Sequence, residues 1–182
     1  MRYAALFFVL TLAACSREPF HMTDISGAMP RLDFHLTRAS DGKPVNGESY
    51  RGQVVVLYFG YTNCPDICPA TLANMAGVLS KVGSKDVRLL FVTVDPKRDT
   101  PPVLNRYVHA FSPQFDGLRG SDEDLADVAR RYRVAYTVDA KPPYTVMHSN
   151  AVFFFDPAGR IRLVTTDTND TDAIAEDVRR LL

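Results

Sequence analysis

This chain lacks an excess of either charge, enough cysteines for a network of disulfides, and a long apolar segment. Its 182 residues include 21 Lys or Arg and 21 Asp or Glu, so the charge balance gives no electrostatic reason to expect nucleic acid as a partner. Three cysteines are too few for a disulfide-stabilised scaffold. The remaining composition, 46% hydrophobic and 23% charged without an internal repeat, is that of one ordinary globular domain.

The first residues are strongly apolar, but the apolar run is too short to cross a bilayer. Met1 and Arg2 precede YAALFFVLTLAA, which has the charged start and short hydrophobic centre of a secretory signal peptide. The run ends in LAAC, which is similar to the lipobox of bacterial lipoproteins. We therefore interpret residues 1–14 as a signal peptide of the lipoprotein type and Cys15 as the lipidated residue. The alternative is an ordinary cleaved signal that leaves Cys15 as a spare thiol.

Residues 15–30 are polar, contain two prolines and show no hydrophobic period, so we predict a tether there. The folded domain would then comprise residues 31–182. This organisation predicts an exported protein of the bacterial cell envelope, anchored to a membrane by lipid and facing the periplasm.

The rest of the chain alternates predicted strands and helices. Leu32, Phe34 and Leu36 alternate before a turn at Asp41-Gly42, as in an antiparallel hairpin. Two β-branched runs, residues 53–60 and 87–95, have the composition of strands that are buried on both faces. Helical spacing follows each run, and the chain closes with a hairpin around the DPAG turn and an amphipathic helix.

This order of elements predicts an α/β fold with a mixed central sheet, flanking helices and an N-terminal β-hairpin. A cysteine pair that leaves a buried strand and enters a helix is the thioredoxin-like placement. We therefore expect a thioredoxin-like domain whose chemistry lies at Cys64 and Cys68.

Cys64 and Cys68 are separated by three residues, one more than in the usual dithiol enzymes. Pro65 and Pro69 stiffen the loop, and the start of the following helix is expected to favour thiolates, so we expect both sulfurs to be reactive. The threonine of a Pro-x-x-x-Thr-x-x-Cys peroxidase pattern is absent, and a second paired cluster for structural zinc is missing. Two thiolates with one imidazole would suit a three-coordinate Cu(I) site.

His148 is the best candidate for that imidazole. It lies in a proline-bearing loop that leads into a buried strand, where loops of α/β sheets often carry function. The alternative is a histidine that only caps the strand. The other three histidines are interpreted as surface or packing residues: His21, His35 and His109.

Three segments together resemble the Sco (SenC) family of copper chaperones: FGYTNCPDICPATL, VTVDPKRDTPPVL and YTVMHSNAVFFFDPAGR. The resemblance covers roughly residue 30 to the C-terminus. It implies a thioredoxin-like fold and copper, as Cu(I) with Cu(II) left open, bound by Cys64, Cys68 and His148. It associates Asp95 with the surroundings of the metal. The alternative for this segment is a strand-end turn in which Asp99 caps the next helix.

Met147 stands where the family often has an acidic residue. A thioether at this position could add a soft contact to Cu(I). However, alternation along an extended segment points neighbouring side chains to opposite faces, so we predict that Met147 lies in the core.

The resemblance implies delivery of copper to the binuclear copper site of a terminal oxidase such as cytochrome c oxidase. The expected partners are the copper-accepting oxidase subunit, a thioredoxin-like reductant or another periplasmic copper chaperone, and the membrane through the lipid anchor. The alternative function is a thiol-disulfide reductase that keeps the metal-ligand cysteines of the target reduced, with Cys64 attacking and Cys68 resolving. We expect a metallochaperone rather than an enzyme, and His148 discriminates the two functions because dithiol exchange does not need it.

Overall fold

The computed structural model describes residues 18–182. The predicted signal peptide and Cys15 lie outside the described residues. Within residues 18–182, none of the helices combines the length and hydrophobicity that a membrane crossing requires.

The domain is built on one mixed sheet of eight strands, in the order β1-β10-β9-β4-β5-β6-β2-β3. These strands are β1 (Thr23–Asp24), β2 (His35–Arg38), β3 (Pro44–Asn46), β4 (Val54–Gly60), β5 (Val87–Thr93), β6 (Phe115–Arg119), β9 (Val152–Phe155) and β10 (Ile161–Thr165). The central strands β4, β5 and β6 are parallel, and β9 runs antiparallel to β4. A separate antiparallel hairpin is formed by β7 (Tyr136–Asp139) and β8 (Thr145–His148).

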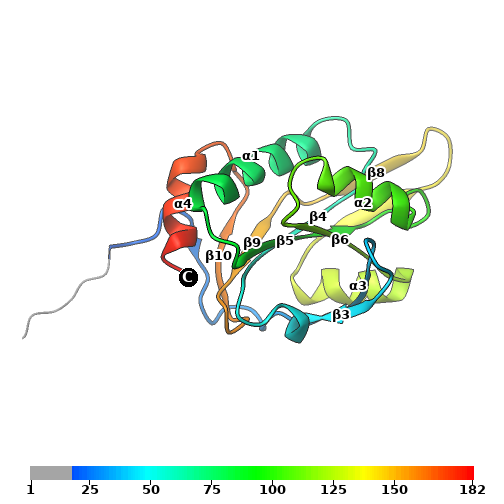
Figure 1. The fold of residues 1–182 in the computed structure, drawn as a ribbon. Coiled ribbons are helices and arrows are strands. Elements are labelled where there is room, and N and C mark those ends of the chain that lie inside the picture. The colour runs from blue at the N-terminus through cyan, green and yellow to red at the C-terminus, as the bar shows by residue number, and fades with distance from the viewer. Residues whose placement is uncertain (1–17) are drawn as a thin grey trace, which may run out of the picture.

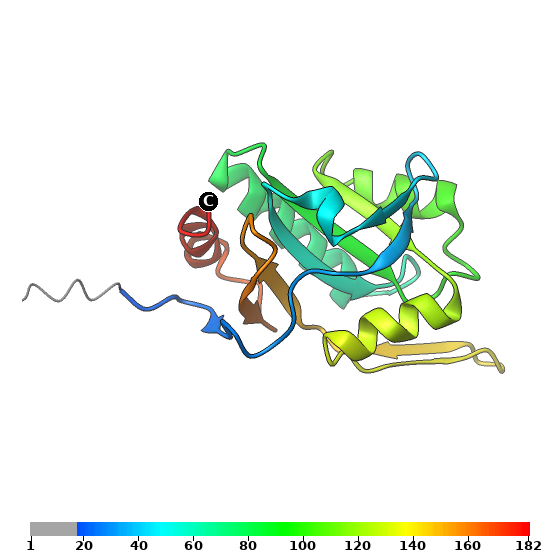
Figure 2. The same ribbon diagram turned by 90° about the horizontal axis from the view of Figure 1, so that it is seen from below.

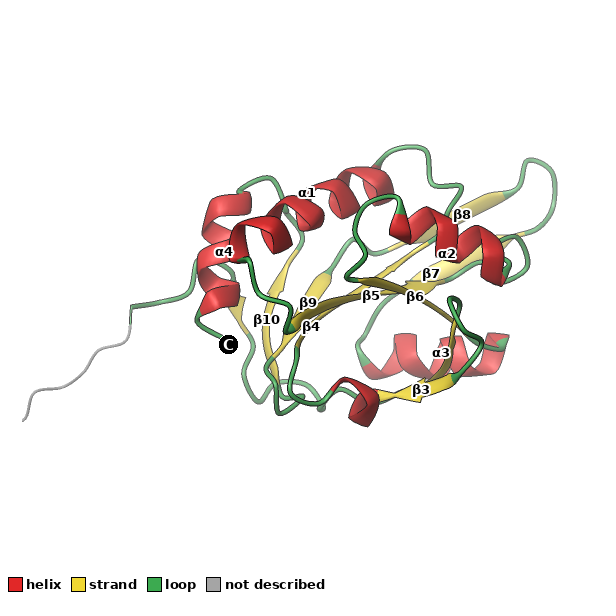
Figure 3. Ribbon diagram, viewed as in Figure 1, coloured by secondary structure: helices red, strands yellow, loops and turns green. Residues whose placement is uncertain are grey.

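Helices cover both faces of the sheet, as Figure 1 and the secondary-structure view of Figure 3 show. The helices are α1 (Ile67–Val82), α2 (Pro101–His109), α3 (Asp122–Arg131) and α4 (Thr171–Arg179), with a short 3-10 turn, η1 (Gly47–Tyr50). α1, α2 and α4 lie on one face, and α3 lies on the other, beside the β7–β8 hairpin (Figure 2). The predicted mixed α/β sandwich of thioredoxin-like type is confirmed.

The core explains why the apolar runs of the sequence form the central strands. All seven residues of β4 are buried, and β5 pairs with it in parallel register from Val54↔Val87 to Gly60↔Thr93. A strand covered by helices on one face and by α3 on the other needs apolar side chains at every position. β4 therefore ends deep inside the domain, and the cysteine loop begins at that end.

The predicted hairpins are both present. β2 pairs with β3 around Asp41-Gly42, and β9 pairs with β10 around Asp156 to Gly159. The predicted final helix is present as well; its N-cap is Asp170, whose carboxylate accepts the Ala173 N–H at 3.0 Å.

Apart from the two-residue β1, two strand regions were not predicted. β6 reads FDGLR, whose Asp116 and Gly117 interrupt the apolar pattern. Inside the fold, Asp116 accepts a hydrogen bond from the Tyr50 hydroxyl at 2.9 Å, and Gly117 leaves room for Leu104 of α2, since a Cβ there would lie 2.6 Å from that side chain. The second region is the β7–β8 hairpin, where we had predicted a loop.

The described part of the predicted tether packs on the domain. β1 pairs with β10, and the Met22 N–H donates to the buried carboxylate of Asp177 at 2.8 Å. The Arg180 guanidinium donates to the Pro19 carbonyl at 3.0 Å and lies 4.0 Å from the centre of the Phe20 ring. The expectation of a free linker is therefore corrected for these residues, because α4 and β10 hold them in place.

Candidate metal centre

Cys64 lies in the loop that connects β4 to α1, and Cys68 lies at the start of α1. The loop after β4 turns back, and the Cys64 N–H donates to the Tyr61 carbonyl at 3.2 Å. Cys68 lies in the first turn of α1, and its N–H donates to the Cys64 Sγ at 3.4 Å. Both residues are free thiols; Cys68 is fully buried and Cys64 is half-buried. The predicted placement of the cysteine pair, between a buried strand and the start of a helix, is thus confirmed.

The β7–β8 hairpin brings His148 to this pair. The His148 Nε2 lies 3.2 Å from the Cys68 Sγ, and the ligand atoms of Cys64, Cys68 and His148 all lie within 4.8 Å of one another. The other ring nitrogen, Nδ1, lies 2.9 Å from the Ser149 carbonyl. Since a carbonyl only accepts, Nδ1 carries the proton in this bond, and Nε2 is left with a free lone pair toward the sulfurs. The three side chains therefore form a soft donor set that can hold a metal ion.

Protonation differs sharply between the two thiols. Burial raises the pKa of Cys68 to about 12, despite its place at the helix start. Burial also raises the pKa of Cys64, but hydrogen bonds from the backbone amides of Asp66 and Cys68 outweigh it and bring the pKa below its ordinary value. The expectation that both sulfurs are equally reactive is therefore corrected: without a metal, Cys64 loses its proton far more readily than Cys68 does.

The imidazole is neutral and sits between aromatic rings. Burial lowers the pKa of His148, although the contact with the Ser149 carbonyl opposes this effect. The Tyr61 ring meets the imidazole edge-on at a centroid distance of 5.8 Å, and the Tyr58 ring does so at 6.1 Å. A neutral, oriented imidazole is the form that binds soft metal ions.

Gly60, the last residue of β4, makes room for the buried sulfur. A Cβ at this position would lie 2.9 Å from the Cys68 Sγ and 2.7 Å from the Phe91 ring. Any larger residue would push Cys68 out of its place.

Asp95 is not part of the donor group, but its partner Arg98 lies 5.8 Å from the centre of the Tyr61 ring, which meets His148 edge-on. The Asp95 side chain is buried, its carboxylate pairs with the Arg98 guanidinium, and it accepts the Tyr144 hydroxyl at 2.8 Å. The expected place of Asp95 in the surroundings of the site therefore agrees with the structure.

Asp99 has a role that the sequence did not reveal. The N-cap of α2 is Thr100, and Asp99 instead accepts the Thr62 hydroxyl at 2.6 Å, the Thr62 N–H at 3.1 Å and the Thr93 hydroxyl at 2.5 Å. The alternative in which Asp99 caps the helix is corrected. This buried carboxylate fastens the cysteine loop to the end of β5.

The prediction that Met147 lies in the core is wrong. Its side chain is 69% exposed, because His148 takes the inward-facing position and alternation turns Met147 to solvent. The three other histidines are exposed and apart from the centre, as expected: His21, His35 and His109. Cys15 lies outside the described residues.

Comparison with curated proteins identifies relatives over most of the chain. It is 41% identical over 138 residues to the mitochondrial SCO2 homolog of Bos taurus, a match of 72% of this chain and 52% of that protein. It is 37% identical over 150 residues to the mitochondrial SCO1 homolog 1 of Arabidopsis thaliana, covering 80% of this chain and 45% of the relative. The chain thus spans about half the length of the curated relatives it matches.

Solved structures share both fold and sequence with this chain. The crystal structure of Arabidopsis thaliana ScoI with copper bound superposes with a TM-score of 0.75 at 36% identity, covering 82% of this chain and 95% of the other. The solution structure of apo Sco1 from Thermus thermophilus gives a TM-score of 0.80 at 33% identity, covering 92% and 99%. The family model described as SCO1/SenC matches residues 24–182, which include every element of the domain except the first residue of β1, and the chain therefore belongs to the SCO1/SenC family.

Proposed function

We propose that this protein binds one copper ion, as Cu(I), between Cys64, Cys68 and His148 and delivers it to the copper-accepting subunit of a terminal oxidase. The observation that carries the proposal is the convergence of two sulfurs and one neutral imidazole within 4.8 Å. Two thiolates and an imidazole match the preferences of Cu(I). Relatives solved with copper bound, from Arabidopsis thaliana and yeast, support the choice of metal.

The oxidase as acceptor is supported by the family. A structural relative at 25% identity is described as a member of the Sco family of cytochrome c oxidase assembly proteins. The binuclear copper site of the oxidase is the acceptor we propose. Because Cys68 is buried while Cys64 and His148 are half-buried, acceptor ligands would approach from the side of the latter two, and Cys68 would leave the copper last.

Loading the site moves protons on this chain. Cys68 is a neutral thiol in the metal-free protein, so copper must displace its proton to bind as a thiolate ligand. Cys64 and His148 need less change, because the pKa of the Cys64 thiol is lowered and burial keeps the His148 imidazole neutral. Delivery reverses the process, and Cys68 regains its proton as copper leaves.

We also propose that the protein is exported and anchored through lipidated Cys15, with the domain facing the periplasm of a bacterial envelope. The support is the sequence pattern of residues 1–15. Replacing Cys15 with alanine is expected to move the protein from the membrane fraction to the soluble periplasmic fraction. Retention of the Cys15→Ala variant in the membrane would contradict the lipid anchor.

A second function, thiol-disulfide reduction, is favoured by the asymmetry of the two thiols. The half-buried Cys64, with its lowered pKa, is placed to attack a disulfide of the target and form a mixed disulfide. Cys68 would then attack the Cys64 sulfur while its proton passes to the departing target thiolate, which releases the target as a dithiol and leaves a Cys64–Cys68 disulfide. A dithiol reductant of the thioredoxin-like class would have to restore the pair. Copper binding needs the same two sulfurs in the reduced form, so the two functions compete for one site.

The deciding experiment is an anaerobic Cu(I) titration of the reduced protein against a competing chelator, with Cys15 replaced by serine to leave only two thiols. We expect one copper per chain, lost in the Cys64→Ser/Cys68→Ser variant and weakened at least 10-fold in His148→Ala, roughly the value of one ligand. His109→Ala, an exposed histidine on α2, is the matched control and should bind as the parent does. Absence of copper binding alongside disulfide turnover would leave the reductase as the function.

A further inference from the structure

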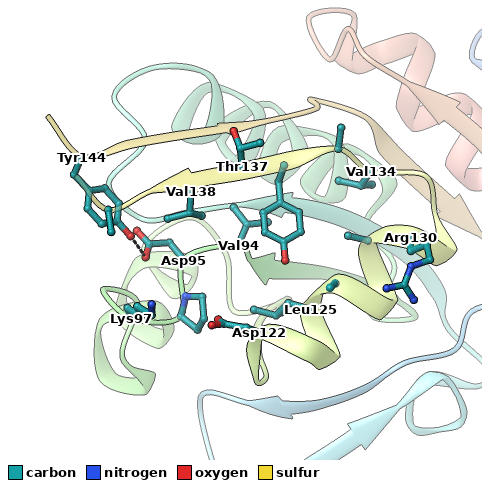
Figure 4. Close-up of a pocket in the computed structure, with 16 residues that line it drawn as sticks. Val94, Asp95, Lys97, Asp122, Leu125, Arg130, Val134, Thr137, Val138 and Tyr144 are labelled. Carbon is teal, nitrogen blue, oxygen red and sulfur yellow. Dashed lines mark hydrogen bonds between the residues drawn. The ribbon is translucent and has the colours of Figure 1, made fainter. Parts of the chain in front are cut away.

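The β7–β8 hairpin that carries His148 stands outside the main sheet. Among residues 18–182, its strands pair only with each other, from Tyr136↔His148 at the base to Asp139↔Thr145 at the far end. A cavity of about 620 Å³ separates β7 from α3 and from the turn that follows β5 (Figure 4). Its walls include Val94, Leu125 and Val138. An isolated two-stranded hairpin is marginal by itself, so something else must hold it against the body of the domain.

The far end of the hairpin is fastened by three residues, Asp95, Arg98 and Tyr144, which we call the latch. Tyr144 directly precedes β8, and its hydroxyl donates to Asp95 Oδ1 at 2.8 Å, the bond drawn in Figure 4. The Arg98 guanidinium pairs with the other oxygen of that carboxylate and stacks over the Tyr144 ring, with its carbon 3.9 Å from the ring centre. Asp95 is only 1% exposed, so these contacts form around a charge that water does not reach. A hydrogen bond to such a charge is stronger than one between neutral groups.

The latch also touches the cysteine side of the centre. The Arg98 guanidinium carbon lies 5.8 Å from the centre of the Tyr61 ring, which is the ring that meets His148 edge-on. The Tyr61 hydroxyl in turn reaches the Val146 carbonyl of β8 at 3.5 Å. Asp99, next to Arg98, holds Thr62 of the cysteine loop. The short segment from Asp95 to Asp99 therefore contacts both of the segments that supply ligand atoms.

We propose that the latch positions His148: it holds the hairpin down so that the imidazole stays on the two sulfurs, and its release lets the imidazole withdraw while both sulfurs remain in place. This inference rests on the proposed copper function and adds positioning residues to it. Tyr144 is the residue to change, because it lies at the surface end of the latch. Replacing Arg98 would leave the buried Asp95 carboxylate without its partner, and replacing Asp95 would leave the Arg98 guanidinium without its own. Either change could destabilise the whole domain.

The test is a double-mutant cycle on Cu(I) affinity, measured by chelator competition on the reduced full chain. We expect Tyr144→Ala to raise the Cu(I) Kd by about 10-fold when His148 is present, and by less than about 2-fold in the His148→Ala background. Tyr144→Phe keeps the stacking on Arg98 and should recover part of the loss. Equal losses in both backgrounds would overturn the latch, because they would show that Tyr144 acts on the whole domain rather than through the imidazole.

Arg130→Gln is the matched control. Like Arg98, Arg130 pairs with an aspartate three residues earlier, at 2.7 Å from Asp127, and it lines the same cavity from α3. It has no contact with Tyr144, so its Cu(I) Kd should equal that of the parent. A 10-fold loss in this variant would assign the effect to the cavity wall and not to the latch.

A second measurement needs no copper. Amide hydrogen exchange of the reduced, metal-free chain should be about 10-fold faster in β8 of Tyr144→Ala than in the parent, with β4 and β5 unchanged. Unchanged exchange in β8 would overturn the latch even if copper binds. If the parent bound no copper, the proposed function would fail, and the exchange result would still decide whether the latch holds the hairpin.

Discussion

Cys68 and His148 approach to 3.2 Å, yet the segments that carry them are built in opposite ways. The cysteine half of the site consists of β4, the loop that carries Cys64, and the start of α1. β4 lies in the middle of the eight-stranded sheet and is buried at all seven positions. The histidine half is a two-stranded hairpin beside a cavity of about 620 Å³, with Met147 exposed to solvent.

This contrast suits a protein that must hold copper and also give it up. Elements with few buried contacts open at a lower free-energy cost than core strands. The thiols therefore form a fixed platform, and the imidazole is the ligand whose attachment can change without unfolding the domain. Variants in the two halves should accordingly fail in different ways.

The largest effect is expected at Asp99, on the cysteine side. Asp99→Ala leaves the Thr62 amide and hydroxyl and the Thr93 hydroxyl without their acceptor, which should lower the free energy of unfolding by about 3 kcal/mol. Urea denaturation of the reduced, metal-free chain measures this. Asp127→Ala, which removes an exposed carboxylate, should cost less than about 0.5 kcal/mol. Equal stability of the two variants would show that the cysteine loop is not fastened as the contacts suggest.

Gly60→Ala tests the platform more locally. The added methyl group would crowd the Cys68 Sγ and the Phe91 ring, so we expect the free energy of unfolding to fall by about 2 kcal/mol and Cu(I) affinity to fall with it. Gly77→Ala in α1 is the matched control, because a Cβ there meets nothing within 4 Å. That substitution should be neutral or stabilising, since alanine favours helices more than glycine does. A stable Gly60→Ala variant with parental Cu(I) affinity would mean that Cys68 and Phe91 can shift to accommodate the methyl group at little cost.

The pH dependence of copper binding separates the halves without mutation. Cys68, with a pKa of about 12, holds its proton throughout the neutral range and must lose it to bind copper. Binding therefore releases at least one proton, and each unit of lower pH should raise the apparent Cu(I) Kd by about 10-fold, or 1.4 kcal/mol. His148, whose pKa is lowered, stays neutral above pH 7 and adds no slope there. Chelator competition at pH 7, 8 and 9 should give the same slope in His148→Ala, and a slope that vanished in this variant would contradict the assignment to the thiols.

The same division explains which features could be predicted from the sequence. The segments around the cysteines contain continuous apolar runs. These runs were enough to predict β4, β5 and the helix that follows the cysteine loop. The raised pKa of Cys68 could not be predicted. The sequence shows the helix start, which lowers the pKa of a thiol, but it does not show the burial in the packed domain, which raises this pKa and has the larger effect. Asp99 was similarly hidden, since its partners Thr62 and Thr93 come from two other segments.

The histidine half gives weaker local signals. The strands of the hairpin are four residues each and mostly polar or exposed, which reads as a loop. His148 was identified by its family motif and by its place before a buried strand, and its distance from the sulfurs depends on a hairpin that the residue pattern does not reveal. Met147 and His148 do point to opposite faces, as alternation predicts. His148 is the residue that faces inward, because its imidazole packs against the Tyr58 and Tyr61 rings.

Met147 carries the smallest expected effect and tests the orientation of the hairpin. Because it is 69% exposed and on the opposite face from its neighbour, Met147→Ala should change the Cu(I) Kd by less than about 2-fold, or roughly 0.4 kcal/mol, whereas His148→Ala weakens binding strongly. The two variants differ by one position on the same strand, so a general loosening of β8 would affect both. A 10-fold loss in Met147→Ala would instead mean that the hairpin turns over when copper arrives and offers a thioether as a further soft ligand. Chelator competition on the two variants in parallel distinguishes a hairpin that only presents the imidazole from one that exchanges its ligands.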